Sequence, residues 1–329
     1  MVNILIFRTD KIGDFLISCP TIITIKKYFK ESHITLISSE KNYNYANNLN
    51  IFDKIYIFPK KSFLQKIKFI NILRKNKYDY TFIFDGKERS IIATSLIKSN
   101  IKVSLSQNIK FYFKFLGIKF VNDNENTNLD SIFQKMLSIS NINVSISNYD
   151  FLLNRKENNF SNNIPIKQYI QIHLDEKWFS HLYIKSYKNI NPTFSEFIDF
   201  LNVLSKNDNV LISTGLVDFD LISKLINEYF EKINNKIFMK KNNDKLIFLI
   251  YKPTIDDLVS LFKNAKTAIL CHPGIIHIAS ALNIKIIDII EKDKRLHYQK
   301  WTSHIKKYNS IYRDDFNLLK KNLLNKIYE

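Results

Sequence analysis

The sequence has few of the residues on which disulfide scaffolds, metal sites and glycine-rich loops depend: 2 Cys, 5 Gly and 6 Pro in 329 residues. Cys19 and Cys271 lie far apart in apolar surroundings, so we expect reduced thiols and exclude a disulfide-stapled secreted scaffold. The 7 His are scattered, and none has carboxylates at ligand spacing, so we expect no metal site. A Walker loop, a Gly-x-Gly-x-x-Gly fingerprint and a Gly-x-Ser-x-Gly elbow are also missing.

Long apolar stretches are absent as well. No run approaches the ~18 consecutive apolar residues of a membrane-spanning helix. The short apolar run at the N-terminus leads into charges rather than into small residues, so we expect no signal peptide and a cytoplasmic protein. A hydrophobic content of 45%, with 14% aromatic residues, is ample for a globular core. Because 329 residues exceed a typical single core, we expect two domains.

Acidic residues are outnumbered, because 31 Asp and Glu stand against 49 Lys and Arg, a formal net charge of +18. Almost all the basic residues are Lys, since Arg occurs only at positions 8, 74, 89, 155, 295 and 313. Two interpretations are open: a compositional bias that also enriches Ile and Asn, or attraction to an anionic surface. No Cys/His finger, basic zipper or aromatic RNA-binding signature is present. We therefore expect no nucleic-acid partner and favour a peripheral position on an anionic inner membrane.

Short apolar strands alternate with helical patterns through the first half of the chain. We predict strands at Asn3–Phe7, His33–Ile37, Lys54–Phe58, Tyr80–Phe84 and Ile101–Leu105, and helices at Phe15–Phe29, Asn42–Asn48, Ser62–Asn76, Arg89–Lys98 and Asp130–Ser138. This alternation indicates βαβ units and a parallel sheet. Pro20 predicts either a kink in the first helix or a helix that begins near Cys19. The basic, aromatic segment Lys110–Leu116 has no clear assignment, and Asn122–Asn128 is predicted as a loop.

The alternation restarts after a polar segment. Residues 156–164 are predicted as a linker between an N-terminal domain over 1–155 and a C-terminal domain over 165–329, because few apolar residues there could pack. In the second domain we predict strands at Tyr169–His173, Val210–Ser213, Lys245–Ile250, Thr267–Cys271 and Ile284–Ile290, and helices at Ser195–Ser205, Asp220–Ile233, Ile255–Asn264 and Ile275–Leu282. Thr254 and Asp257 predict a capping box. A last helix over Asp315–Tyr328 is expected, free to pack back onto the first domain.

The segment Arg8-Thr9-Asp10-Lys11-Ile12-Gly13-Asp14 joins the first strand to the first helix. Open α/β sheets build their sites at such places, at the carboxyl ends of strands. Gly13 permits a tight turn, and Asp14 falls in the first turn of the helix. Asp14 has two interpretations: it complements the helix dipole, or it is a catalytic group.

A second segment of this kind is Cys271-His272-Pro273-Gly274-Ile275-Ile276-His277. A buried strand leads into a Pro-Gly turn and then into a helix whose first N–H groups could bind an anion. Gly274 lets a phosphate approach the backbone, and His277 lies on the same helix face. The alternative is a tight turn followed by a buried, hydrogen-bonded His.

Three further strand ends carry polar residues. Lys177 could contact an anionic leaving group, and the alternative is a solvated loop Lys. Thr214 and Gly215 could contact a ribose. Lys87 and Arg89 could bind an acceptor phosphate, and the alternative is a charged, exposed helix start.

Taken together, these motifs resemble glycosyltransferase family 9, the heptosyltransferase family of lipopolysaccharide core synthesis. Three separated stretches carry the likeness in the same order: the Arg8–Asp14 opening followed by Cys19-Pro20, the Lys177-Trp178 pair, and Thr254–Leu282 with its Gly-x-x-His core. The resemblance implies an α/β GT-B fold, two Rossmann-like domains facing each other across a cleft. The first would bind the acceptor and the second the nucleotide sugar.

The same resemblance implies a reaction. A heptose or related sugar would move, with inversion, from ADP-heptose or another nucleotide-diphosphate sugar to a lipopolysaccharide core or other surface glycan, lipid-linked or phosphorylated. Neither a cofactor nor a metal is required. Two alternatives stay open: a sugar-nucleotide epimerase of the same architecture, and a non-catalytic protein that binds anionic glycans.

Carried over residue by residue, the resemblance makes Asp14 the general base. Donor-binding residues are expected at Lys177, Thr214, Gly215, His272, Pro273, Gly274 and His277, and acceptor-binding residues at Arg8, Lys11, Lys87 and Arg89. One departure concerns the donor. The family usually has Asp-Thr-Gly or Asp-Gly-Gly where this chain has His272-Pro273-Gly274. A different donor sugar from ADP-heptose is therefore open, because His272 cannot accept as a carboxylate does and Pro273 lacks a backbone N–H.

Overall fold

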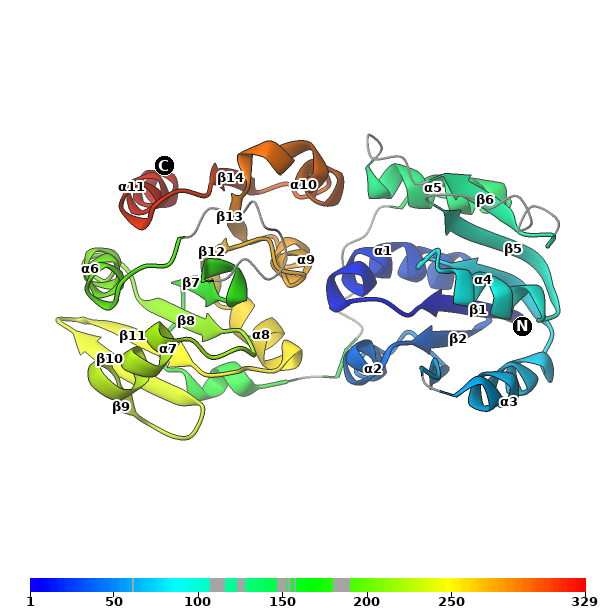
Figure 1. The fold of residues 1–329 in the computed structure, drawn as a ribbon, viewed down its shortest axis with the longest axis horizontal. Helices are drawn as coiled ribbons and strands as arrows, with labels where there is room; N and C mark the ends of the chain where they lie inside the picture. Colours follow the sequence, from blue (N-terminus) through cyan, green and yellow to red (C-terminus); the bar gives the residue numbers. More distant parts are fainter. Residues whose placement is uncertain are drawn as a thin grey trace. The chain divides into compact units, whose positions relative to one another are not determined.

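The computed structural model describes residues 1–60, 62–106, 116–122, 128–146, 152, 155–156, 158–179 and 190–329. The expectations for Asn122–Asn128 and Lys110–Leu116 lie almost wholly outside these residues. The chain forms two compact units, Met1–Lys156 with Gln299–His304, and Glu157–Tyr298 with Ile305–Glu329. Each unit has its own β-sheet with helices against it (Figure 1). The predicted α/β class is confirmed.

The first unit has, among its described residues, a six-stranded sheet in the order β3-β2-β1-β4-β5-β6, with every neighbouring pair parallel. Its strands are β1 (Val2–Arg8), β2 (Ser32–Ser38), β3 (Lys54–Ile57), β4 (Tyr78–Ile83), β5 (Ser99–Ser106) and β6 (Lys119–Asn122). Its helices are α1 (Ile12–Tyr28), α2 (Glu40–Asn47), α3 (Phe63–Arg74), α4 (Glu88–Ser95) and α5 (Leu129–Ile139). The strands and helices predicted for the first half are confirmed, and β6 was not predicted.

Strand β1 lies at the centre of this sheet. Residues 4–7 are fully buried, because helices cover both faces of a parallel sheet and leave no polar side for the strand. β1 pairs with β2 on one side and with β4 on the other. The strand order therefore reverses between β1 and β4, and such a switch point is where open α/β sheets bind ligands.

Helix α1 runs without interruption through Pro20. The expectation of a helix that begins near Cys19 is wrong, since the helix already begins at Ile12. The Thr24 hydroxyl donates to the Pro20 carbonyl at 2.9 Å, one turn later. Tertiary packing outweighs the local cost of the proline, because the helix is buried from Phe15 to Ile25.

The second unit has, among its described residues, an eight-stranded sheet in the order β14-β13-β12-β7-β8-β11-β10-β9. Its strands are β7 (Tyr169–Leu174), β8 (Val210–Thr214), β9 (Glu231–Lys232), β10 (Ile237–Asn242), β11 (Lys245–Ile250), β12 (Ala265–Leu270), β13 (Lys285–Ile290) and β14 (Tyr308–Tyr312). Its helices are α6 (Phe194–Leu204), α7 (Asp220–Lys224), α8 (Ile255–Phe262), α9 (Ile276–Ala281) and α11 (Phe316–Tyr328), with α10 (Arg295–Thr302) shared between the units and short turns η3 (Phe160–Asn163), η4 (Glu176–Trp178), η5 (Leu225–Tyr229) and η6 (Lys292–Lys294).

One expectation for the second half needs correction, and two strands were not predicted. The helix predicted over Asp220–Ile233 ends early: α7 passes into the π-helical turn η5, and β9 follows. Strands β10 and β14 were not predicted. β10 is an amphipathic strand whose antiparallel pairing with β11 and β9 gives it a backbone partner on each side, which its own sequence does not reveal.

The expected linker over 156–164 packs against α8 in its later part. The Ser161 N–H donates to the Ser260 hydroxyl at 3.0 Å, and the Asn158 amide donates to Asp257 at 3.2 Å. The capping box of Thr254 and Asp257 is confirmed at the start of α8. The last helix, α11, packs in the core of the second unit, and residues 299–304 are the later segment that groups with the first unit.

Candidate functional site

The carboxyl end of β1 carries the acidic turn that the sequence singled out. Lys11 is the N-cap of α1, and Asp14 is its N3 residue. One Asp14 oxygen, Oδ2, accepts the Lys11 N–H at 3.3 Å, which is the helix-capping role that the sequence left open. The side chain is half-buried, and within the described part of the chain Oδ1 has no hydrogen bond. Capping therefore leaves one carboxylate oxygen available.

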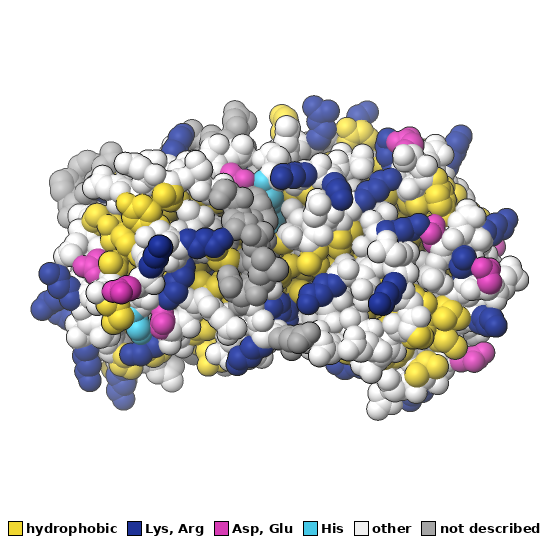
Figure 2. All heavy atoms as spheres, turned by 180° about the vertical axis from the view of Figure 1, so that it is seen from behind, with side chains coloured by type: hydrophobic (Ala, Val, Ile, Leu, Met, Phe, Trp, Pro, Cys, Tyr) yellow, Lys and Arg dark blue, Asp and Glu magenta, His cyan; other side chains and the backbone are white. Residues whose placement is uncertain are grey.

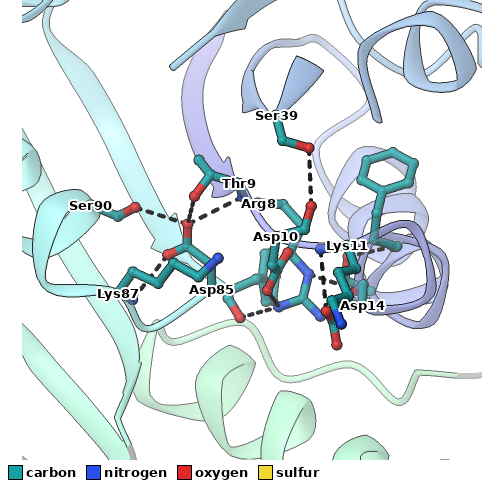
Figure 3. A network of polar contacts seen from close by, with 12 residues as sticks. Arg8, Thr9, Asp10, Lys11, Asp14, Ser39, Asp85, Lys87 and Ser90 are labelled. Atoms are coloured by element: carbon teal, nitrogen blue, oxygen red, sulfur yellow. Dashed lines mark hydrogen bonds and ion pairs between the residues drawn. The ribbon is translucent and has the colours of Figure 1, made fainter. Parts of the chain in front are cut away.

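Arg8 fixes the position of this turn. Its side chain is only 4% exposed and donates inward (Figure 3). Nε and one terminal nitrogen donate to the Asp14 carbonyl, and the other terminal nitrogen donates to the Phe84 carbonyl and to Asp10. A buried guanidinium that bridges the Asp14 carbonyl in α1 and the Phe84 carbonyl at the end of β4 holds the first turn of α1 rigidly against β4.

Asp85 joins the same two strand ends from the β4 side. Its carboxylate accepts the Thr9 N–H at 3.1 Å, the Thr9 hydroxyl at 2.5 Å and the Ser90 hydroxyl at 2.8 Å (Figure 3). It also accepts the Lys87 N–H at 3.2 Å. Gly86, which follows it, has φ +56°, and a Cβ there would come within 2.8 Å of the Leu105 carbonyl. The sharp turn after Asp85 therefore needs glycine.

A third acid, Asp10, completes the corner. Its backbone carbonyl accepts the Ser39 hydroxyl at 3.0 Å and the Asn42 amide at 3.1 Å, which ties the turn to α2. Burial raises the pKa of the Asp10 carboxyl to about 6; the Arg8 guanidinium opposes this shift, and the nearby carboxylates Asp14 and Asp85 add to it. We call Arg8, Asp10, Asp14 and Asp85 the acidic corner. Its charge is concentrated where the switch point predicts a site.

The second unit has a corner of its own at the carboxyl end of β12. His272 has φ +47°, in the left-handed region, where a non-glycine residue is strained by about 1–3 kcal/mol. Its backbone N–H donates to Asp288 Oδ1 at 2.7 Å, and its ring Nδ1 lies 2.7 Å from Asp288 Oδ2. Asp288 is fully buried on β13 and also accepts the Tyr308 hydroxyl at 2.9 Å. Because a carboxylate only accepts, this bond places a proton on Nδ1 and leaves Nε2 as the acceptor of a neutral ring.

Lys177 reaches this corner from the end of β7. Its ammonium Nζ donates to the His272 carbonyl, so two segments far apart in the sequence meet. Lys177 is held at the backbone on both sides: Asp175 accepts its N–H at 3.2 Å, and Arg313 donates to its carbonyl. Arg313 in turn pairs with Glu291 at 3.1 Å. We call Asp175, Lys177, His272 and Asp288 the basic corner, after the Lys177 ammonium.

Two buried titratable groups lie next to Lys177. Burial raises the pKa of Asp175 to about 7, although the Lys177 ammonium opposes the shift. Burial also lowers the pKa of His173 to about 3, and Lys177 adds to that shift. The neutral His173 ring lies 3.0 Å from the Ser213 hydroxyl, so it is a satisfied core histidine.

The remaining donor-side candidates are placed less favourably for a ligand. The Thr214 hydroxyl is buried and accepts the Lys252 N–H at 2.8 Å. Gly215 packs where a Cβ would lie 3.0 Å from the Asp175 Cα, so close packing of two strand ends explains this glycine. His277 is buried in α9, a helix of 6 residues, so little dipole stands behind the expected anion site. Gly274 is half-buried.

The chain is similar to several known proteins, although no family profile matches it. The curated lipopolysaccharide heptosyltransferase 1 of Campylobacter coli is 28% identical over 135 residues, which are 38% of this chain and 38% of that protein. A family 9 glycosyl transferase from Veillonella parvula superposes with a TM-score of 0.69 at 13% identity, covering 99% of this chain and 89% of the other. The chain has the GT-B fold.

A second structure, Escherichia coli heptosyltransferase WaaC with ADP, superposes with a TM-score of 0.68 at 12% identity over 98% of this chain and 99% of that one. The fold expected from the sequence resemblance is thus confirmed. A UDP-GlcNAc 2-epimerase from Methanocaldococcus jannaschii also superposes, with a TM-score of 0.57 at 14% identity over 100% and 92% of the two chains. Architecture alone does not separate a transferase from an epimerase.

On the GT-B fold, the predicted acceptor residues fall into two groups. Arg8 is turned inward, so its place indicates a positioning role rather than the expected contact with an acceptor. Lys11 and Arg89 are exposed and Lys87 is half-buried at the rim of the acidic corner. Arg89 donates to the Thr9 hydroxyl at 2.8 Å, which holds its guanidinium at that rim.

Sequence reasoning named no role for Asp85, Asp175 or Asp288. Each accepts hydrogen bonds that shape one of the two corners, and Asp85 and Asp175 each follow a buried strand. An acid at that position was the signal available in the sequence for Asp85 and Asp175. Nothing local marks Asp288, because it lies within the apolar strand β13. Within the described part of the chain no group of three His, Cys, Asp or Glu could hold a metal ion, and no helix is long and apolar enough to span a membrane.

Proposed function

We propose that this protein is a glycosyltransferase that moves a sugar, heptose or a related one, from a nucleotide-diphosphate donor to a hydroxyl of a lipopolysaccharide core or similar glycan. The observation that carries the proposal is the acidic corner. The Asp14 carboxylate has one unbonded oxygen, and a buried arginine holds the Asp14 backbone carbonyl at the switch point. That is the arrangement a general base needs, because its position must be set before the acceptor arrives.

The chemistry is a single displacement. Asp14 takes the proton of the acceptor hydroxyl, the hydroxyl oxygen forms the new bond to the anomeric carbon, and the bond from that carbon to the nucleoside diphosphate breaks with inversion. The leaving diphosphate carries away the electron pair. General-base catalysis of this kind contributes about 10²–10⁴-fold.

The basic corner would receive the leaving group. An ammonium has three N–H donors, and Lys177 uses one on the His272 carbonyl, so two remain for phosphate oxygens. The Gly274 backbone beside it permits close approach, as the resemblance implies. Preorganised positive charge stabilises the leaving diphosphate without reorganisation during the reaction.

The donor sugar is expected to meet His272. The Nε2 of an imidazole whose Nδ1 is held by Asp288 accepts a hydrogen bond when the ring is neutral. The usual family residue is a carboxylate, so the two groups select different hydroxyl patterns. ADP-heptose is one donor to test, and other nucleotide sugars belong in the same screen.

The deciding experiment incubates the purified protein with ADP-, GDP- and UDP-sugars, with and without a lipopolysaccharide-core acceptor. Acceptor-dependent release of nucleoside diphosphate supports the transferase. Isomerised sugar nucleotide formed without acceptor supports the epimerase, and glycan binding with no nucleotide binding supports the non-catalytic alternative.

Lys177→Ala provides the test of the basic corner. We expect it to weaken binding of the nucleoside diphosphate by roughly 10-fold or more while acceptor binding is retained, because a charge-assisted hydrogen bond contributes about 1.5–3 kcal/mol. Lys206→Ala, at a lysine exposed beyond the end of α6, is the matched control and should bind as the wild type does. Equal losses for donor and acceptor would contradict the assignment.

A further inference from the structure

Helix α3 has apolar side chains on its outer face. Its inner residues Phe69 and Leu73 pack in the core of the first unit. On the solvent side, Phe63 is 75% exposed, Leu64 69%, Ile67 40% and Ile72 44%. Single exposed apolar residues are normal on a protein surface, but here several lie on one helix, with 63, 64 and 67 adjacent at the start. An exposed cluster of this kind marks an interaction surface.

The charge around this cluster has one sign. From residue 60 to residue 78 the sequence contains no Asp or Glu, while Lys or Arg stands at 60, 61, 66, 68, 74, 75 and 77. Lys68, Arg74, Lys75 and Lys77 are exposed. Lys60 is exposed too but is not counted with them, because its ammonium pairs with the Glu40 carboxylate at 2.5 Å. We call the exposed apolar residues of α3, together with these four exposed basic side chains, the α3 surface.

Positive charge alone does not distinguish the α3 surface. Figure 2 shows Lys and Arg side chains spread over the face in view, on both units, with few acidic ones among them. That spread agrees with a compositional bias. What distinguishes this segment is that exposed apolar side chains and exposed basic side chains coincide on α3 and the turn that follows it. A face of this composition fits the boundary between lipid headgroups and acyl chains.

The α3 surface begins on the carboxyl-end side of the sheet, where the acidic corner also lies. β3 runs parallel to β1, and α3 follows β3, so the first turn of α3 lies at the carboxyl ends of the strands. Phe58, in the short connection between them, lies beneath the Arg89 guanidinium at 5.5 Å. Phe63 and Leu64 therefore lie on the carboxyl-end side of the sheet, as Asp14 does.

We propose that the α3 surface docks this protein on an anionic lipid bilayer, with Phe63 and Leu64 inserted among the acyl chains and the basic side chains against the headgroups. The occupant is a bilayer because every titratable side chain from 60 to 78 except Tyr78 is basic, which complements anionic headgroups, and because Phe63 and Leu64 are apolar and largely exposed. The proposal does not depend on the proposed activity. Docking at this edge would bring the acidic corner close to the headgroup layer.

The test measures binding of the full chain to sedimented vesicles of phosphatidylcholine alone and of phosphatidylcholine with phosphatidylglycerol, at low and high salt. The wild type should bind the anionic vesicles and release as salt rises. Phe63→Ser with Leu64→Ser should weaken binding by roughly 10-fold or more, since each buried apolar side chain contributes to the partition. Lys68→Glu with Lys75→Glu should weaken it as strongly, and only at low salt.

The matched control is Leu296→Ser with Leu318→Ser, which removes apolar side chains of 69% and 44% exposure from other helices. It should bind vesicles as the wild type does. The proposal is overturned if the wild type does not bind anionic vesicles, if the control loses as much binding as the α3 variants, or if the α3 variants change only the oligomeric state in solution. Far-UV circular dichroism of each variant confirms folding, and the charge variant gives a second measurement should the serine variant unfold.

Discussion

Asp14→Asn separates the two roles that Asp14 can have. The amide oxygen of asparagine can still accept the Lys11 N–H, so the helix cap is retained in kind. The substitution removes the negative charge from the first turn of α1, which costs about 0.3–1 kcal/mol. It also removes the only group at this position that could take a proton. The stability and the turnover of the variant should therefore change by very different amounts.

The expected magnitudes follow from the geometry. If Asp14 only caps the helix, the free energy of unfolding falls by less than about 1 kcal/mol and the turnover follows the folded fraction. If Asp14 is the base, the turnover falls by about 10²–10⁴-fold, equivalent to about 2.7–5.4 kcal/mol in the activation barrier. Arg8 binds the Asp14 backbone carbonyl rather than its carboxylate, so the loop should keep its position in the variant.

The assay measures kcat with a saturating nucleotide sugar and acceptor, donor binding by thermal shift, and the free energy of unfolding in urea. The matched control is Asp53→Asn, which removes a carboxylate that pairs with Lys26 at 3.3 Å and accepts the Ile34 N–H, away from the acidic corner. It should lose stability and keep its turnover. Substantial turnover by Asp14→Asn, with donor binding intact, would refute the role of Asp14 as the base.

Two further predictions concern the groups that hold the corners. Arg8→Lys should lower the free energy of unfolding by about 1–3 kcal/mol, because one ammonium cannot span the carbonyls of Asp14 and Phe84. It should also lower kcat while the donor Kd stays unchanged. Arg89→Lys, at the exposed rim, is the comparison, and equal kcat for the Arg8 variant and the wild type would contradict the positioning role. Asp175→Asn should change the pH dependence of stability. The pKa of Asp175 is about 7 in the folded protein against 3.8 for a free carboxyl, so the folded protein binds more protons than the unfolded chain between these values. The wild type therefore loses stability relative to the variant as pH rises from about 4 to about 7, at up to about 1.4 kcal/mol per pH unit. Urea unfolding of both proteins across this range measures the difference, and parallel curves would contradict the raised pKa.

Much of the fold follows from local patterns. β1 was predicted because a run of apolar residues without alternation is typical of a strand buried on both faces, and residues 4–7 are indeed fully buried. The capping box at Thr254 was predicted because its partner lies three residues away. The positions of Asp14, Lys177 and His272 just after strand ends were also predicted, because a strand end is marked by a change from apolar to polar composition within a few residues.

What the sequence did not determine depends on which strands become neighbours. Arg8 was expected to face a ligand and is turned inward, because the Phe84 carbonyl from β4 lies beside it. β10 needed the partners β11 and β9, and Asp288 gained its role only because β13 lies beside β12. The helix over Asp220–Ile233 was interrupted by β9, which pairs with β10.

The sequence by itself therefore determined the α/β class, the alternation of strands and helices, and the strand ends that carry polar residues, since periodicity and composition act over a few residues. Tertiary structure alone decided which of those residues face solvent and which hold the turn, because hydrogen-bond partners such as Phe84 for Arg8 and Asp288 for His272 come from other strands. Burial then set the raised pKa of Asp10 and Asp175 and the lowered pKa of His173. A local pattern contains no information about burial by distant segments.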